Sequence, residues 1–173
     1  LLQDYWTTSN GIIDTYFRRK PGVSRDAVLQ FNNDVVLVED GLALTYRGGD
    51  MLQTELLVSH FGSASLRNAV LTYTVALNGN LLVDKTLPAP QAAPGTLTKL
   101  SNVIESLPAV DTPARLVLNA QLTAGDLSRT NTWTAWVYPS HPRAASGTVF
   151  ASAELLPWLE AYGAGPLPQE PPY

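Results

Sequence analysis

A chain of 173 residues is long enough for one domain of ordinary size with an appendage. It is 45% hydrophobic and 15% charged, which excludes a disordered chain, and a formal net charge of −4 with scattered basic residues argues against nucleic-acid binding. The absence of cysteine excludes disulfide scaffolds, Cys-zinc sites and thiol catalysis, and it is compatible with any compartment. No apolar run is long enough to span a membrane.

The first zone, residues 1–33, predicts a strand, a loop and a helix. An apolar segment runs through Trp6 and a polar loop follows it. Pro21 suits a first helical turn, so we expect a helix over residues 21–31. The apolar residues on one face of this helix are Val23, Ala27, Val28 and Phe31. Because the chain starts inside an apolar run and without Met, we expect it to be a piece of a longer protein, and this zone to be the last βα unit of an α/β fold.

The second zone, residues 34–140, changes to a period of two. Asn78-Gly79 between two β-type runs predicts a tight hairpin, because both turn residues need a positive φ. The candidate strands cover residues 35–38, 42–46, 52–60, 69–77, 81–83, 97–107, 114–122 and 130–138. This spacing predicts a mainly β fold: an immunoglobulin-like antiparallel β-sandwich of about seven strands, with a jelly roll as the nearest alternative.

The third zone, residues 141–173, predicts a linker, a short helix and a Pro-rich tail. Small residues dominate 142–147, and Val149-Phe150 is a further strand candidate. Ser152 is a candidate N-cap for a helix that Pro157 interrupts, so this helix should be short or bent. The tail from residue 166 is rich in proline.

The sequence carries few candidates for catalysis. It has neither a Gly-x-Ser-x-Gly nucleophile motif nor a phosphate-binding Gly-rich loop, and its carboxylates are spread singly. The only histidines, His60 and His141, lie too far apart for a metal-binding motif, so we expect both to be ordinary strand or loop residues. We therefore predict no catalytic residue, no metal ligand and no cofactor for this chain.

Trp133 and Trp136 are the aromatic residues with a candidate binding role in the second zone. Residues three apart on a strand point to opposite faces, so one ring should lie in the core and the other should be partly exposed or covered by a neighbouring domain. Either ring could instead stack on a sugar. Trp6 differs, because it follows an expected strand, where α/β barrels place ligand-contacting residues.

Residues 2–14 (LQDYWTTSNGIID) and 18–22 (RRKPG) resemble the end of the catalytic barrel in family 2 glycoside hydrolases, the β-galactosidase, β-mannosidase and β-glucuronidase type, with the β-mannosidase-like branch closest. In that family an immunoglobulin-like sandwich follows the barrel. Residues 132–139 (TWTAWVYP) resemble its closing strand and residues 58–62 (VSHFG) an early one.

This resemblance implies an accessory C-terminal part of such an enzyme. Trp6 would form part of the sugar subsite, and Asp4 is a second candidate for contact with the sugar, although its main role would be to hold the loop. The two catalytic Glu residues of the family belong to barrel strands that this chain lacks, so it would not hydrolyse a glycoside alone; its partner would be the rest of the enzyme, which acts with retention. The alternative is an independent carbohydrate-binding or adhesion module. The residues predict neither a nucleic-acid nor a membrane partner, and they leave the oligomeric state open. The sequence agrees equally with a secreted, a periplasmic or a cytoplasmic bacterial parent protein.

Overall fold

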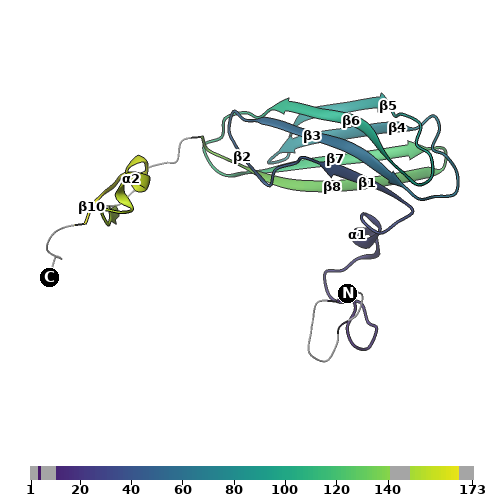
Figure 1. Ribbon diagram of the computed structural model, residues 1–173, viewed down its shortest axis with the longest axis horizontal. Helices are drawn as coiled ribbons and strands as arrows, with labels where there is room; N and C mark the ends of the chain where they lie inside the picture. The colour runs from purple at the N-terminus through teal and green to yellow at the C-terminus, as the bar shows by residue number, and fades with distance from the viewer. Residues whose placement is uncertain (1–3, 5–10, 141–148, 168–173) are drawn as a thin grey trace.

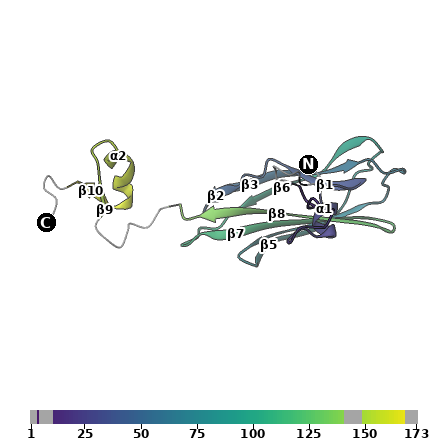
Figure 2. The ribbon, with the colours of Figure 1, turned by 90° about the horizontal axis from the view of Figure 1, so that it is seen from below.

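The centre of the molecule is a two-layer β-sandwich (Figure 1). The computed structural model describes residues 4, 11–140 and 149–167. The strands of the sandwich are β1 (Val35–Asp40), β2 (Thr45–Arg47), β3 (Met51–His60), β4 (Val70–Leu77), β5 (Asn80–Pro88), β6 (Thr96–Ser106), β7 (Ala114–Ala124) and β8 (Leu127–Tyr138). Figure 2 shows the sheet that contains β3 stacked on the sheet that contains β7.

The two sheets have three and five strands. The order is β1-β3-β6 in the first sheet and β2-β8-β7-β4-β5 in the second. All pairs within the sandwich are antiparallel except β2 with β8. The chain changes sheets repeatedly, as in Greek-key sandwiches. The predicted mainly β, immunoglobulin-like antiparallel sandwich is therefore confirmed, and the strand expected at residues 42–46 is the shorter β2.

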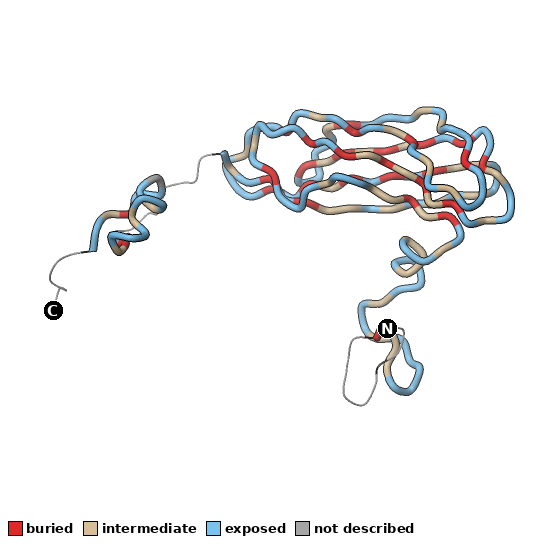
Figure 3. The backbone as a smooth tube through the Cα atoms, viewed as in Figure 1, coloured by how far each residue is buried: buried red, intermediate tan, exposed pale blue. Residues whose placement is uncertain are grey.

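Alternation of side chains builds the core between the sheets. In β3, every second residue from Leu52 to His60 is buried, and β7 buries every second residue from Ala114 to Leu122. Figure 3 shows the buried positions recurring along the strands of both sheets. A strand with one face on the core and one face outward requires this period of two.

The predicted hairpin forms between β4 and β5. Asn78 has a φ of 48° and Gly79 a φ of 84°, and Leu77 pairs with Asn80 across the turn. Both central residues thus adopt the left-handed conformation that this two-residue turn demands.

The N-terminal segment departs from the sequence prediction. Its helix, α1 (Arg25–Leu29), has five residues and no buried side chain. The expected start at Pro21 is wrong, because Gly22 with a φ of 82° forms a turn there and Ser24 caps the helix by accepting a hydrogen bond from the Ala27 N–H. The expected strand through Trp6 lies outside the described residues.

A second small unit lies clear of the sandwich in both ribbon views (Figures 1 and 2). It comprises β9 (Val149–Ala151), α2 (Leu156–Leu159), the 3₁₀ helix η1 (Glu160–Tyr162) and β10 (Ala164–Pro166), and β9 and β10 pair in parallel.

The short C-terminal helix is confirmed, but Ser152 is not its N-cap. Leu155 holds that position, and the Ser152 carbonyl instead accepts from the N–H groups of Leu155 and Leu156 in the turn before the helix. The linker at 142–147, His141 and the end of the Pro-rich tail lie outside the described residues. In the part of the chain that is described, no helix is long and apolar enough to cross a membrane.

Candidate functional site

The residues predicted to contact sugar do not gather at one place. Trp6 lies outside the described residues. Asp4 belongs to the N-terminal segment, which leaves the sandwich beside the start of β1, whereas Trp136 lies near the end of β8, on the side that leads to the C-terminal unit (Figure 1). A single site that joins Asp4 to Trp136 is therefore not what the fold provides.

Asp4 connects three parts of the N-terminal segment. Its carboxylate Oδ1 accepts hydrogen bonds from the Gly11 N–H at 2.8 Å and from the Lys20 Nζ at 2.7 Å, and its own N–H donates to the Ile13 carbonyl at 3.0 Å. The hydrogen bond from Lys20 and that from the Gly11 backbone hold the pKa of Asp4 below its usual value, against partial burial that raises it. These three hydrogen bonds tie residue 4 to Gly11, Ile13 and Lys20.

Trp133 and Trp136 point to opposite faces of β8, as their spacing predicts. Trp133 is partly buried and packs against the core between the sheets, on the same side as Ala135 and Val137. Trp136 lies on the outer face and is 44% exposed, and Tyr138 shares that face. Of these two rings, Trp136 is therefore the one that offers its indole to a ligand from outside.

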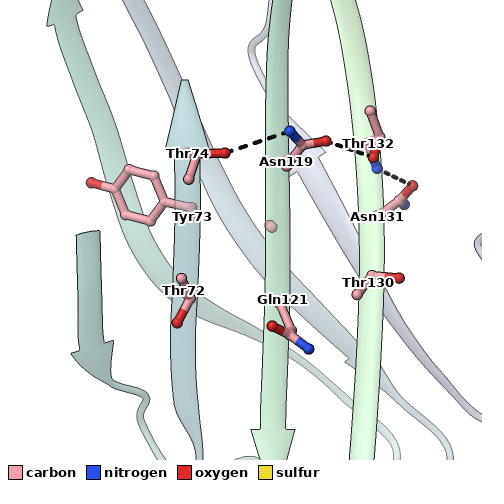
Figure 4. Close-up of a pocket in the computed structure, with 9 residues that line it drawn as sticks. Thr72, Tyr73, Thr74, Asn119, Gln121, Thr130, Asn131 and Thr132 are labelled. Atoms are coloured by element: carbon pink, nitrogen blue, oxygen red, sulfur yellow. Dashed lines mark hydrogen bonds between the residues drawn. The ribbon is translucent and has the colours of Figure 1, made fainter. Parts of the chain in front are cut away.

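The outer face of the five-stranded sheet carries a polar depression of about 360 Å³ (Figure 4). Six uncharged polar side chains on three neighbouring strands line it: Thr72, Thr74, Asn119, Gln121, Thr130 and Thr132. The register places them in two rows, with Thr72, Gln121 and Thr130 in one and Thr74, Asn119 and Thr132 in the other. Neighbouring strands are roughly 4.8 Å apart, so the six groups form a regular grid of donors and acceptors.

Hydrogen bonds between strands hold part of this grid. The Thr132 hydroxyl donates to the Asn119 Oδ1 at 2.8 Å, and the Asn119 Nδ2 donates to the Thr74 hydroxyl at 3.5 Å. In the other row, Thr72 shares a hydrogen bond with the Thr86 hydroxyl at 3.0 Å, and the Gln121 Nε2 donates to the Ser128 hydroxyl at 3.1 Å. These residues are not evident as a site from the sequence alone, although each occupies an outward position of a strand with period two. What the sequence lacks is the register that aligns them.

The N-terminal segment is attached to the sandwich through β8. The Arg129 guanidinium donates to the Asp34 Oδ1 at 2.9 Å, and the Asn131 Nδ2 donates to the carbonyls of Leu37 at 2.8 Å and Gln30 at 3.3 Å. The hydrogen bond from Arg129 lowers the pKa of Asp34 below its usual value. Gln30 caps the end of α1, so this cluster fixes the point at which the segment leaves the sandwich.

The described depressions lack a pair of facing carboxylates. The polar depression on the sheet contains no acidic residue, the one beside α1 contains Asp26, and the one beside the end of β3 contains Asp34. Hydrolysis of a glycoside by either stereochemical route needs two carboxyl groups across one cleft. Among the residues that the structure describes, no group of three or more His, Asp or Glu side chains is arranged to hold a metal ion.

The fold and these surfaces define an immunoglobulin-like sandwich domain. The chain belongs to the family described as "Domain of unknown function (DUF8488)", whose model matches residues 50–139, the stretch from β3 to β8. No curated protein matches the chain in sequence.

Three solved structures share a similar course of the chain at low sequence identity. They are the CARDB domain of the PF1109 protein from Pyrococcus furiosus, crystallised in complex with di-metal ions; the sporulation control protein Spo0M from Bacillus subtilis; and a conjugative transposon lipoprotein from Bacteroides eggerthii. Their identities are 18%, 13% and 9%, and their TM-scores 0.43, 0.41 and 0.38. The matches cover 60%, 64% and 60% of this chain and 87%, 51% and 98% of theirs.

Proposed function

We propose that this chain is a non-catalytic accessory part of a larger glycoside hydrolase of the family 2 type. In this proposal residues 1–33 complete the neighbouring catalytic barrel, and the sandwich at 34–140 braces that barrel from the side. The parent enzyme cleaves O-glycosidic bonds with retention, through two carboxyl groups that lie outside this chain.

One observation carries the proposal: the N-terminal segment has defined internal bonds but no core. Of residues 11–34, Gly11 alone is buried, while Tyr16, Phe17 and Phe31 are exposed. Ordering a chain costs conformational entropy, which a segment without buried apolar side chains does not recover by itself. Exposed apolar side chains on an ordered segment indicate a surface that another domain covers. The resemblance of residues 2–22 to the end of a barrel supports a catalytic barrel as that domain.

The first test combines an activity assay with the gene. We expect the 173-residue chain to leave p-nitrophenyl β-mannoside, β-galactoside and β-glucuronide intact, and the reading frame upstream of Leu1 to encode a barrel with two catalytic Glu residues. Hydrolysis by the chain alone contradicts the proposal. The control is that heating abolishes this hydrolysis and that a second, independent recombinant preparation shows it again. A reading frame that starts at or just before Leu1 also contradicts the proposal.

The polar grid on the outer sheet favours a second candidate, a carbohydrate-binding module. Hydroxyl and amide groups without charge suit the hydroxyls of neutral sugars, and the exposed ring of Trp136 on the same face could stack on the apolar face of a sugar. This candidate predicts that titration with mannose- or galactose-type oligosaccharides changes tryptophan fluorescence. The change should disappear in Trp136→Ala and persist in Trp158→Ala, a matched control because Trp158 is exposed on the separate C-terminal unit. If the unmodified chain shows no change in fluorescence, the carbohydrate-binding candidate is contradicted.

A further inference from the structure

A braced turn at residues 14–18 holds two aromatic side chains in solvent. The Asp14 Oδ1 accepts from the N–H groups of Tyr16 at 2.8 Å and Arg18 at 2.9 Å, and the Asp14 carbonyl accepts from the Phe17 N–H at 3.0 Å. The Asp14 N–H donates to the Arg18 carbonyl at 2.8 Å, which closes the base of the turn. These four hydrogen bonds therefore hold the backbone of residues 14–18 in one conformation.

The two aromatic side chains at the tip of the turn are exposed to solvent. Tyr16 is 76% exposed and Phe17 is 72% exposed. The Arg18 guanidinium lies 4.9 Å from the centroid of the Tyr16 ring, and its Nε donates to the Asp14 Oδ2 at 2.8 Å, so both interactions restrain the tyrosine.

The backbone of Phe17 is in an unusual conformation. Its φ of 62° lies in the left-handed region, which asparagine and glycine tolerate and aromatic residues rarely adopt. The other non-glycine residues with positive φ in the described part of the chain are Asn68 and Asn78. A strained conformation that exposes an apolar ring points to a role in binding.

The charges at the tip are not balanced within the segment. Arg18 pairs with Asp14, and Lys20 pairs with Asp4. Arg19 is exposed and its side chain has no acidic partner among the described residues. A partner surface that covers the tip should therefore supply a carboxylate for this guanidinium.

We propose that Tyr16 and Phe17 form an anchor that inserts into an apolar pocket on a neighbouring protein domain, with a carboxylate at the pocket's rim for Arg19. A turn tip is convex, whereas small-molecule and sugar sites are concave, so the shape favours a protein pocket over a sugar. Tyrosine and arginine are also typical of the residues that dominate protein interfaces. This inference rests on the proposed function, because it takes the neighbouring domain to be the upstream part of the same polypeptide.

A photo-cross-linking experiment identifies what covers the anchor. p-Benzoylphenylalanine replaces Phe17 in the longer polypeptide that the reading frame encodes, and a second preparation carries it in place of Phe61, which is also 72% exposed but lies on the sandwich. We expect Phe17 to cross-link to a peptide upstream of Leu1 within the same molecule, and Phe61 not to cross-link there. The anchor proposal is overturned if Phe17 cross-links to a second copy of the chain, or if it cross-links to no protein. It is also overturned if mannose or galactose abolishes the cross-link.

Thermal unfolding of matched variants gives an independent readout. Phe17→Gly relieves the positive φ and removes a side chain without packing partners, so the 173-residue chain should unfold at an unchanged or higher temperature. In the longer polypeptide the same change should lower the transition by several degrees, while Phe61→Gly should act alike in both. Equal effects of Phe17→Gly in the two polypeptides overturn the anchor. If the upstream domain cross-links but lacks glycosidase residues, the anchor stands and the proposed function fails.

Discussion

Single residues at turns carry a conformational requirement that their contacts do not reveal. A Cβ placed on Gly79 would meet no atom within 4 Å, so space does not explain the glycine. Its φ of 84° does, because residues with a Cβ rarely adopt the left-handed region. The hairpin between β4 and β5 depends on this one backbone choice.

Gly79→Ala should therefore lower the free energy of unfolding by about 1 kcal/mol through backbone strain alone. Urea denaturation followed by tryptophan fluorescence measures this change. Asn80→Ala is the control, since Asn80 is exposed at the next position and should change the free energy by less than about 0.5 kcal/mol. Equal stability of Gly79→Ala and the parent chain would show that the turn does not need a left-handed glycine.

His60 shows how a buried polar side chain is satisfied inside the sandwich. It is 1% exposed, its Nε2 lies 2.8 Å from the Ala64 carbonyl, and its Nδ1 accepts from the Gly62 N–H at 3.2 Å. A carbonyl only accepts, so Nε2 carries the hydrogen and donates it. The histidine thus ties the end of β3 to the loop that follows it.

His60→Ala should cost about 1–3 kcal/mol of unfolding free energy, because it removes a buried side chain together with its hydrogen bonds to the Gly62 N–H and the Ala64 carbonyl. The same urea experiment checks it, with Phe61→Ala as the control that removes an exposed neighbour. A loss no larger than that of the control would mean that water replaces the imidazole at both groups.

At the scale of elements, the strands were predictable because their pattern is local. Alternation in residues 52–60 and 114–122 identified β3 and β7 with the correct inward faces. The parallel pairing of β2 with β8 was not predictable, since partners 90 residues apart leave no trace in either strand's own pattern. The apolar face of residues 23–31 predicted a longer helix, but a short helix is marginal without apolar packing, and no side chain of α1 is buried.

The N-terminal segment relies on carboxylates where the sandwich relies on apolar packing, so acid should separate the two. Asp4, Asp14 and Asp34 have pKa values below the ordinary aspartate value of 3.8, chiefly through hydrogen bonds from Lys20, the Arg18 backbone and Arg129. A lowered folded-state pKa contributes stability above the ordinary value, and that stability is lost as pH falls through the lowered value.

Between pH 6 and pH 2.5, the amide resonances of Gly11 and Arg18 should therefore move before those of the sandwich strands do. Two-dimensional NMR measures both sets in one titration. Asp4→Asn should leave the Gly11 amide with no further acid transition from this carboxylate. Simultaneous loss of all amides at one pH would indicate that the segment and the sandwich form one cooperative unit.

For the molecule as a whole, the sequence predicted part of the candidate surface. The spacing of Trp133 and Trp136 was sufficient to place them on opposite faces, because it depends only on strand geometry. The polar grid around Asn119 needed the register of three strands, which no single segment encodes. The anchor at Tyr16 and Phe17 needed a backbone angle and two exposures that a sequence pattern does not report.

The central claim is that a neighbouring domain orders residues 11–34, while hydrogen bonds from Arg129 and Asn131 attach the end of this segment to the sandwich. Hydrogen exchange followed by mass spectrometry tests it directly, by comparing peptides from this segment in the 173-residue chain and in the longer polypeptide encoded with the upstream reading frame. We predict that in the isolated chain the segment exchanges fast, while β3, β4 and β7 exchange slowly. In the longer polypeptide the segment should exchange at least tenfold more slowly. Protection of residues 11–34 equal to that of the sandwich in the isolated chain, or unchanged exchange in the longer polypeptide, would contradict the account.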